Sequence, residues 1–360
     1  MSAGSDACFG LARRRAILVT GAGGEMGTGL IDRLSERNDA EVLALDLHPL
    51  EPNLARRCAV ELQGDILDAR LIERLVAEFE IHAVFHLAAL LSTRAEFSPE
   101  TAHEVNVQGT LSLLKMATEQ SRAQGEPVKF LFPSSIAVYG LAGPEEKALA
   151  GRLTEDQFNR PITMYGCNKL ACEHLGRYYA SHYRQLSAER SAPSIDFRAI
   201  RFPGLISAFT LPHGGTSDFA PEMVHAAARG EPYACFVRED TRIPFMAMPD
   251  AIDGLLQLFE APREALTRST YNLGSFAPTA LELADRVRRA FPSADISFRP
   301  DPARQGIVDS WPADVDDGRA RQDWGFHPRF DERAAFEHYL VPNIRERYAN
   351  SGSNPRDTGR

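Results

Sequence analysis

Two residues four positions apart could carry acid–base chemistry in this chain. Tyr165 and Lys169 lie in a stretch expected to be helical, and residues four apart on a helix share one face. An ammonium group beside a phenol favours the phenolate, so the phenol can lose its proton near neutral pH. A tyrosine in this setting can act as the base that removes a proton from a substrate alcohol.

A glycine-rich turn near the N-terminus could bind the hydride acceptor that such a reaction needs. Gly21, Gly24 and Gly27 follow the apolar run 16–20 and open an amphipathic stretch, 24–37. Glycine lets backbone amides approach a pyrophosphate, and a helix N-terminus favours its negative charge. We therefore expect a bound dinucleotide. The turn residues expected to contact it are Gly21, Gly24, Glu25, Met26 and Gly27.

Acidic residues after the next two apolar runs suggest how the rest of the dinucleotide binds. Asp46 ends the run 41–46, where its carboxylate could accept hydrogen bonds from the ribose hydroxyls and repel a 2′-phosphate, which favours NAD over NADP. The alternative role is a turn-forming Asp before a proline. Asp65 and Ile66 follow the run 59–63 and by position could hold the adenine, unless they are ordinary loop residues.

A pair of hydroxyls closes the fifth apolar run. Ser134 and Ser135 follow the run 128–132, where a hydroxyl would face the nicotinamide end of a cofactor cleft. Such a hydroxyl can orient the substrate oxygen and stabilise its developing charge. The alternative is a pair of strand-end serines that make local turns. One Ser, one Tyr and one Lys in this order predict a catalytic triad.

The elements that must position these residues alternate along the chain. The expected strands are 16–20, 41–46, 59–63, 82–86, 128–132 and 194–201, and the expected helices are 24–37, 69–79, 100–124 and 163–185. Strands that alternate with helices predict an α/β fold with a doubly wound parallel sheet, a Rossmann fold. Ligands then bind at the carboxyl ends of the strands.

The alternation breaks after Pro203, where prolines separate short elements. We expect a NAD-binding domain at 13–202 with a return to the sheet at 243–262. A smaller interleaved substrate-binding region would take 203–242 and 263–345. The polar residues 350–360 are expected to form a disordered tail.

Composition excludes several classes of function. The 360 residues carry a net charge of −9, which argues against nucleic acid as a partner. No apolar run approaches the roughly 18 residues of a membrane span, and no signal peptide is recognisable. The five scattered cysteines indicate reduced thiols in a cytoplasmic enzyme. No cysteine or histidine spacing predicts a metal site.

These motifs together resemble the extended short-chain dehydrogenase/reductase superfamily, the NAD-dependent epimerase/dehydratase family. The resemblance implies that Tyr165 is the catalytic base. Lys169 would lower the pKa of that phenol and bind the nicotinamide ribose, and Ser135 would assist the substrate oxygen. It also places Leu87, Ala88, Ala89 and Asn106 at the cofactor, with Asn106 as a structural and proton-relay residue.

Segments spread over nearly the whole chain resemble one branch of that family, the short-chain L-threonine 3-dehydrogenases. They include Gly214-Gly215-Thr216-Ser217-Asp218 and Asp309-Ser310-Trp311-Pro312. The resemblance implies oxidation of the L-threonine β-hydroxyl to L-2-amino-3-oxobutyrate, with hydride transfer to NAD⁺. The amino-acid pocket would contain Ser92, Ser135, Tyr165, Thr216 and Asp218. Asp218 is a plausible partner for the ammonium, and the hydroxyls of Ser92 and Thr216 for the carboxylate.

Three features qualify this resemblance. A Thr is usual in that branch where Ser135 stands, the ending Val138-Tyr139-Gly140 is typical of sugar-nucleotide epimerases, and the stretch 141–159 is longer than usual. The alternatives are therefore a nucleotide-sugar epimerase or dehydratase and, in another class, a non-catalytic NAD-binding regulator, which would not need the triad. The resemblance also implies a homodimer formed through the helices near 100–124 and 163–185.

Overall fold

The computed structural model describes residues 14–37, 40–187, 195–212 and 215–351. Its centre is a parallel sheet of seven strands in the order β11-β7-β5-β4-β1-β2-β3. The strands are β1 (Arg14–Thr20), β2 (Glu41–Asp46), β3 (Val60–Gln63), β4 (Phe79–His86), β5 (Val128–Ser135), β7 (Ile195–Phe202) and β11 (Thr270–Asn272). All six predicted strands belong to this sheet, so the predicted Rossmann-type fold is confirmed.

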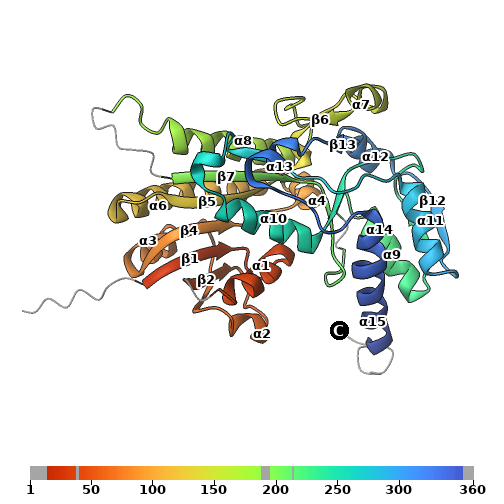
Figure 1. Cartoon of the computed structure of the whole chain (residues 1–360), viewed down its shortest axis with the longest axis horizontal. Coiled ribbons are helices and arrows are strands. Elements are labelled where there is room, and N and C mark those ends of the chain that lie inside the picture. Colours follow the sequence, from red (N-terminus) through yellow and green to blue (C-terminus); the bar gives the residue numbers. More distant parts are fainter. Residues whose placement is uncertain (1–13, 38–39, 188–194, 213–214, 352–360) are drawn as a thin grey trace, which may run out of the picture.

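Helices cover both faces of the sheet (Figure 1). One face is covered by α1 (Glu25–Ser35) and α10 (Met248–Glu260), with α2 (Pro52–Ala55) beside α1. The other carries α3 (Ala69–Glu78), α6 (Gly109–Gln124) and α8 (Met164–Ser181). Successive residues of a strand point to opposite faces. In β1, Ile17 and Val19 accordingly enter the first core, whereas Ala16 and Leu18 enter the second.

A smaller lobe follows the carboxyl ends of the strands (Figure 1). Its helices are α7 (Pro144–Ala150), α9 (Phe219–Arg229), α11 (Ala280–Ala290), α12 (Pro302–Asp309), α14 (Glu332–Ala334) and α15 (Val341–Ser351). α13 (Gly318–Trp324) instead packs on the main sheet, on the face covered by α1 and α10. Its short strands form three parallel pairs: β6 (Arg152–Leu153) with β13 (Asp314–Val315), β8 (Gly204–Ile206) with β10 (Phe245–Ala247), and β9 (Tyr233–Cys235) with β12 (Ile296–Phe298).

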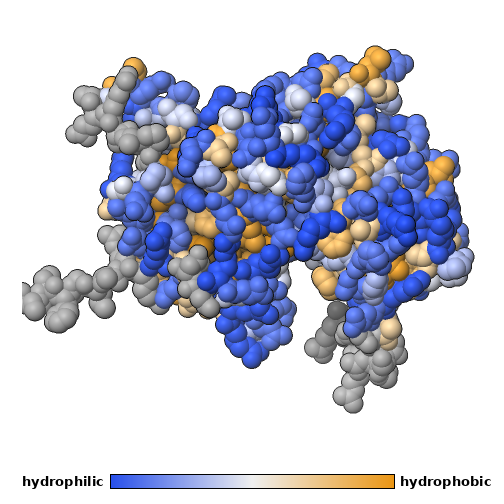
Figure 2. Space-filling view, viewed as in Figure 1, coloured by the Kyte–Doolittle hydropathy of each residue, from blue (hydrophilic) through white to orange (hydrophobic). Residues whose placement is uncertain are grey.

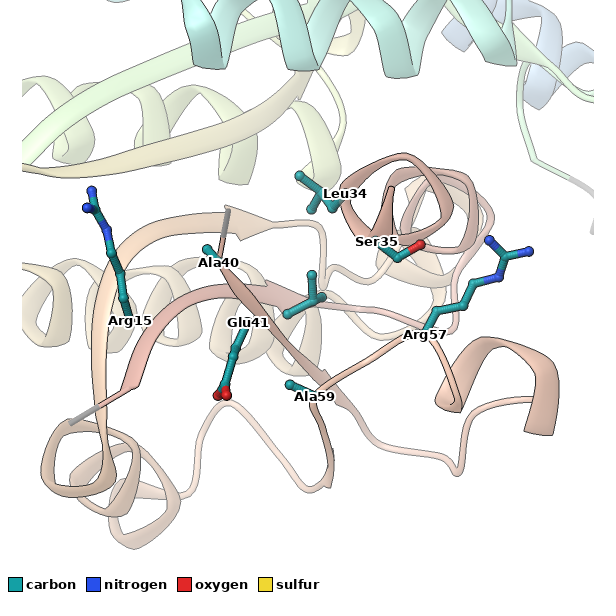
Figure 3. Close-up of a pocket in the computed structure, with 8 residues that line it drawn as sticks. Arg15, Leu34, Ser35, Ala40, Glu41, Arg57 and Ala59 are labelled. Carbon is teal, nitrogen blue, oxygen red and sulfur yellow. The ribbon is translucent and has the colours of Figure 1, made fainter. Parts of the chain in front are cut away.

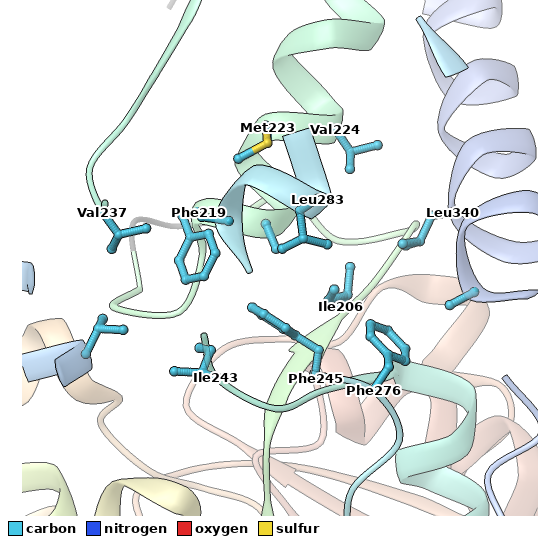
Figure 4. Packing of buried hydrophobic residues seen from close by; sticks show 14 of the residues in the cluster. Ile206, Phe219, Met223, Val224, Val237, Ile243, Phe245, Phe276, Leu283 and Leu340 are labelled. Atoms are coloured by element: carbon cyan, nitrogen blue, oxygen red, sulfur yellow. The ribbon is translucent and has the colours of Figure 1, made fainter. Parts of the chain in front are cut away.

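The small lobe has its own apolar core. Phe219 and Phe245 meet edge to face, with ring centroids 5.5 Å apart. Figure 4 shows them among Met223, Ile206 and Leu283 from α9, β8 and α11. Because this core is built from segments on both sides of α10, the lobe is interleaved with the sheet domain along the chain.

Two boundaries differ from the sequence prediction. β10, expected to rejoin the main sheet, pairs with β8 in a separate sheet, and only the following helix α10 returns to cover the main sheet. Conversely, β11 lies inside the range 263–345 assigned to the substrate-binding region but is an edge strand of the main sheet. Strands of three residues are too short to show a period, so their partners are decided by tertiary packing.

The predicted tail is only partly visible. Positions 350 and 351 are the end of α15, and residues 352–360 lie outside the described residues.

The surface is mostly polar in the view of Figure 2, where hydrophilic residues cover most of the face shown. Among the helices that the structure describes, none has the length and apolar character needed to span a bilayer. Within those same ranges, no cluster of His, Cys, Asp or Glu side chains is arranged to hold a metal ion.

Candidate active site

The glycine turn between β1 and α1 is shaped for a close backbone approach. Gly21 has φ +68°, and a Cβ there would lie 2.7 Å from the amide nitrogen of Ala88. A Cβ on Gly27 would lie 2.5 Å from the carbonyl oxygens of Gly21 and Ala22. Gly24 is the residue before α1, so Glu25, Met26 and Gly27 form the first helical turn. The amides of a first turn point out of the helix end, where they can donate to an anion.

Asp46 lies beside this turn, at the carboxyl end of β2. Its Oδ2 accepts a hydrogen bond from the Gly23 amide at 2.9 Å, and its Oδ1 accepts one from the His48 amide at 3.1 Å. The carboxylate is therefore tied to the glycine turn and to its own following turn. Both roles considered from the sequence, turn formation and a position suited to a ribose, fit this geometry.

The ends of the neighbouring strands complete the edge. Asp65 is exposed and accepts a hydrogen bond from the Leu67 amide at 2.9 Å, whereas Ile66 is buried against Gly109 of α6. After β4, the amide of Leu87 donates to the Thr20 carbonyl at 3.0 Å. The next residues, Ala88 and Ala89, are half-buried. A contact of Ile66 with a ligand is limited by its packing under α6.

The side chain of Asn106 binds the backbone of the loop that follows β4. It lies in a π-helical turn, Glu104–Gln108, that joins α5 (Pro99–His103) to α6. Its Oδ1 accepts from the Leu90 amide at 2.8 Å, and its Nδ2 donates to the Leu90 carbonyl at 3.0 Å. π-turns inside helices are frequent at functional sites. Asn106 therefore has the structural part of the predicted role, and proton relay by it stays a prediction.

The predicted triad converges where β5 and α8 meet. Ser135 is the last residue of β5, and its hydroxyl lies near enough to the phenol of Tyr165, in the first turn of α8, to oppose the rise of the phenol pKa. That turn is fixed by Thr163, which accepts from the Gly166 amide at 3.1 Å, and by Glu96, which accepts from the Met164 amide at 2.8 Å. Ser135 is thus the serine that reaches the phenol.

Lys169 lies one turn further along α8 and is almost fully buried. Its Nζ donates to the Pro133 carbonyl at 2.7 Å and lies 4.6 Å from the centroid of the Phe132 ring and 5.6 Å from that of Tyr165. The shared helix face predicted from the four-residue spacing is therefore present. The ammonium is held against β5 rather than against the phenol oxygen.

Burial is the main cause of the pKa shifts of Tyr165 and Lys169. It raises the pKa of the Tyr165 phenol above its ordinary value, and the nearby hydroxyl of Ser135 opposes that shift. Desolvation therefore outweighs the downward shift of the phenol pKa expected from Lys169, whose ammonium is directed at the Pro133 carbonyl. Burial also lowers the pKa of Lys169 to about 8, with Cys172 and Glu173 opposing the shift.

The hydroxyl groups of Ser92 and Thr216 meet where α4 (Ser92–Phe97) faces the small lobe. Ser92 begins α4, and its Oγ accepts a hydrogen bond from Thr216 Oγ1 at 3.3 Å. Asp218 precedes α9, and its Oδ2 accepts from the Gly215 amide at 2.7 Å. The structure thus brings Ser92 and Thr216 together across 124 residues of chain. Gly214, part of the same motif, lies outside the described residues.

A buried polar network beside the triad was missed from the sequence. Ser134 donates to Glu173 Oε1 at 2.5 Å, and the Arg201 guanidinium donates to both oxygens of Glu173 at 2.9 and 2.7 Å. Glu173 continues the four-residue series of Tyr165 and Lys169, and that spacing was the signal that could have identified it.

A surface hollow lies elsewhere on the molecule (Figure 3). It is lined by Arg15, Leu34, Ser35, Ala40, Glu41, Val42, Arg57 and Ala59. Arg15 is near the start of β1 and Glu41 starts β2, so the hollow is at the amino ends of the strands, opposite the glycine turn. No predicted site residue lines it.

Comparisons with known proteins agree on one family. Residues 17–274 match the NAD dependent epimerase/dehydratase family. The mitochondrial L-threonine 3-dehydrogenase of Bos taurus is 33% identical over 90% of this chain and 81% of its own length. An uncharacterised epimerase/dehydratase of Staphylococcus haemolyticus is also 33% identical, over 93% of this chain and 99% of its own. A solved structure of a monomeric L-threonine 3-dehydrogenase from a metagenome database is 37% identical, covers 92% of this chain and 99% of its own, and has a TM-score of 0.80.

Proposed function

Because this chain belongs to the NAD-dependent epimerase/dehydratase family, we propose that it is a NAD-dependent L-threonine 3-dehydrogenase. The reaction would oxidise the β-hydroxyl of L-threonine to L-2-amino-3-oxobutyrate. The observation that carries the proposal is that Ser135, at the end of β5, and Tyr165, in the first turn of α8, come together beside Lys169, because they present a base and a hydroxyl donor to one substrate oxygen. The choice of threonine rests on relatives named for that reaction.

The cofactor fits the residues present at this edge. Glycine at positions 21 and 27 lets the turn pack closely against the backbone of Ala88 and of Gly21 and Ala22, and α1 begins there with its N-terminal amides, which could donate to a pyrophosphate. Asp46 would bind the adenosine ribose hydroxyls. Asp65 would lie toward the adenine. When bound, NAD⁺ supplies the carbon that accepts the hydride and a positive ring charge that favours the Tyr165 phenolate.

The residues of the chain then have distinct tasks. Tyr165 would accept the proton of the β-hydroxyl while the hydrogen on the same carbon leaves as hydride. Ser135 would donate to the substrate oxygen and hold it near the phenol, and Lys169 would stabilise the phenolate. Asp218 would pair with the substrate ammonium, and the hydroxyls of Ser92 and Thr216 would bind its carboxylate.

The test is NADH formation by the purified protein with NAD⁺ and L-threonine. The same assay is run with four alternative substrates: L-allo-threonine, L-serine, 3-hydroxybutyrate and UDP-glucose. Saturable turnover that strongly favours L-threonine would support the proposal. Tight NADH binding without turnover of any hydroxy amino acid would contradict it. Conversion of UDP-glucose to its epimer would favour the epimerase alternative, for which the Staphylococcus relative is named; that conversion is followed by its product, because an epimerase forms no net NADH.

The predicted homodimer and the cytoplasmic location stay predictions. One similar solved structure is described as monomeric, so membership of the family does not decide the oligomeric state. Light scattering of the purified protein at several concentrations would decide it.

A further inference from the structure

A buried ion pair links the two elements that carry the triad, α8 and β5, to the neighbouring strand β7. Glu173 lies on α8 one turn after Lys169, Arg201 lies on β7, and Ser134 lies on β5 opposite Arg201 in the sheet register. The Glu173 and Arg201 side chains are only 5% and 4% exposed. Glu173 accepts three hydrogen bonds, two from the Arg201 guanidinium and one from Ser134, at 2.5 to 2.9 Å.

The network continues into the small lobe. The guanidinium carbon of Arg201 lies 4.9 Å from the centroid of the Tyr139 ring, and the Tyr139 hydroxyl donates to Asn272 Oδ1 at 2.7 Å. Glu155 accepts from the Asn272 amide at 2.9 Å through its side chain and from Arg201 Nη1 at 2.9 Å through its carbonyl. Tyr139 and the long stretch 141–159, both departures noted in the sequence, thus meet in one network.

Stability alone does not account for such a pair. The desolvation cost of two buried charges offsets most of their attraction, so apolar residues of similar volume would stabilise a core equally well. What a fully hydrogen-bonded pair adds is a single relative position of the elements it joins. Here those elements are α8, which carries Tyr165 and Lys169, and β5, which ends in Ser135.

We propose that Glu173, clamped by Arg201 and Ser134, is a positioning residue that fixes α8 against β5 and β7, so that Ser135 stays within reach of Tyr165 and a carboxylate stays one helical turn from Lys169. The inference rests on the proposed alcohol oxidation. Glu173 itself touches neither substrate nor cofactor in this assignment.

The electrostatic part depends on the groups that surround Lys169. On α8 these groups are Tyr165, Cys172 and Glu173. Of the two groups that raise the pKa of Lys169, Cys172 and Glu173, only Glu173 is a carboxylate. From β4 comes His86, which is neutral because burial, reinforced by the Lys169 charge, lowers its pKa to about 3.

The remaining elements add little charge near Lys169. β5 presents the carbonyl of Pro133 and the ring of Phe132, both uncharged. α6 presents the Thr110 hydroxyl, hydrogen-bonded to His86. β7 contributes Arg201, which is neutralised by Glu173. Removal of the Glu173 charge would therefore leave Arg201 uncompensated and make protonation of Lys169 less favourable.

The experiment compares Glu173→Gln with a matched control, Asp196→Asn. Asp196 forms the other buried arginine pair of β7, with Arg198, at 8% and 1% exposure. That pair lies in the amino-terminal half of the strand, where Arg198 donates to carbonyls at the end of α10, away from the triad. Both variants lose one buried carboxylate charge, so both should melt at lower temperature.

Only Glu173→Gln should change catalysis. We expect its kcat to fall about 10- to 100-fold, because small misplacements of reacting groups have effects of that size, with NADH affinity and the KM for NAD⁺ little changed. Both limbs of its kcat–pH profile should move to lower pH by about one unit, since loss of a nearby negative charge favours the phenolate and the neutral amine. Asp196→Asn should keep the wild-type profile.

Serine variants keep the test decisive if Glu173→Gln does not fold. Ser134→Ala should lower kcat and Ser134→Thr, which retains the hydroxyl, should restore it. Equal pH profiles for Glu173→Gln and wild type, or full kcat in Ser134→Ala, would overturn the proposal. Wild-type inactivity on L-threonine would instead refute the proposed function, and crystal structures would then test the clamp: a Ser135–Tyr165 distance unchanged in Glu173→Gln or Ser134→Ala would overturn it.

Discussion

Replacement of Asp46 by alanine separates its two possible roles. The carboxylate accepts hydrogen bonds from the Gly23 and His48 amides at 2.9 and 3.1 Å, so its removal must loosen the glycine turn whatever it binds. If it also binds the ribose hydroxyls, two further charge-assisted bonds are lost on cofactor binding, each worth about 1.5 to 3 kcal/mol. NADH affinity should then fall about 100-fold or more.

The change in preference between NADPH and NADH tests the ribose role more directly than the loss of NADH affinity does. A carboxylate about 4 Å from a 2′-phosphate repels it by about 2 to 4 kcal/mol per unit charge at a half-buried site. Asp46→Ala removes that repulsion together with the ribose bonds. From the repulsion alone, the ratio of the NADPH and NADH dissociation constants should fall by about 30-fold to several-hundred-fold, because 1.4 kcal/mol corresponds to a factor of ten.

The assay is NADH and NADPH binding by fluorescence titration, with thermal melting of each variant. Asp331→Ala is a suitable control, because Asp331 also accepts a backbone hydrogen bond, from the Ala334 amide at 2.7 Å, but at α14 in the small lobe. It should lower the melting temperature without altering either affinity. If Asp46→Ala weakened NADH and NADPH equally, the carboxylate would be a turn-forming group only, and the assignment of the ribose site would be wrong.

The other predictions concern the triad, the pocket and the turn. Tyr165→Phe should abolish turnover while NADH still binds, whereas Tyr178→Phe, on the exposed part of the same helix, should leave kcat unchanged; turnover in Tyr165→Phe would show that another group is the base. Asp218→Asn keeps an oxygen for the Gly215 amide but loses the charge, so the KM for L-threonine should rise about 10-fold or more with unchanged NADH affinity, and equal effects on both would remove Asp218 from the pocket. Gly21→Ala combines an unfavourable positive φ, which costs about 1 to 2 kcal/mol, with a Cβ 2.7 Å from the Ala88 amide; calorimetry should detect weaker NADH binding, and unaltered binding would mean that the turn does not hold the cofactor.

Prediction from the sequence succeeded where a signal was local. The apolar runs of β1 and β2, the glycine turn and the Tyr165–Lys169 spacing depend on neighbouring residues only, and all appear in the structure as expected. Prediction failed for β10 and β11. These strands of three residues show no period, and their pairing depends on which long-range neighbour is available.

The pKa of Tyr165 likewise depends partly on local sequence and partly on tertiary structure. The sequence placed an ammonium one helical turn from a phenol, and from that spacing alone a lowered phenol pKa followed. In the folded chain the phenol pKa is raised instead. Burial depends on every element packed around Tyr165, and Lys169 is directed to the carbonyl of Pro133 on another strand.

The sequence by itself determined the class of fold, the family and the kinds of chemical group at the site, because periodicity, turn residues and helical spacing act over a few residues. Only the tertiary structure decided which groups meet. Ser92 reaches Thr216, and Glu173 is held between Arg201 and Ser134. Such contacts join residues from 28 to 124 positions apart, and their partners are chosen by the packing of helices on the sheet rather than by any local pattern.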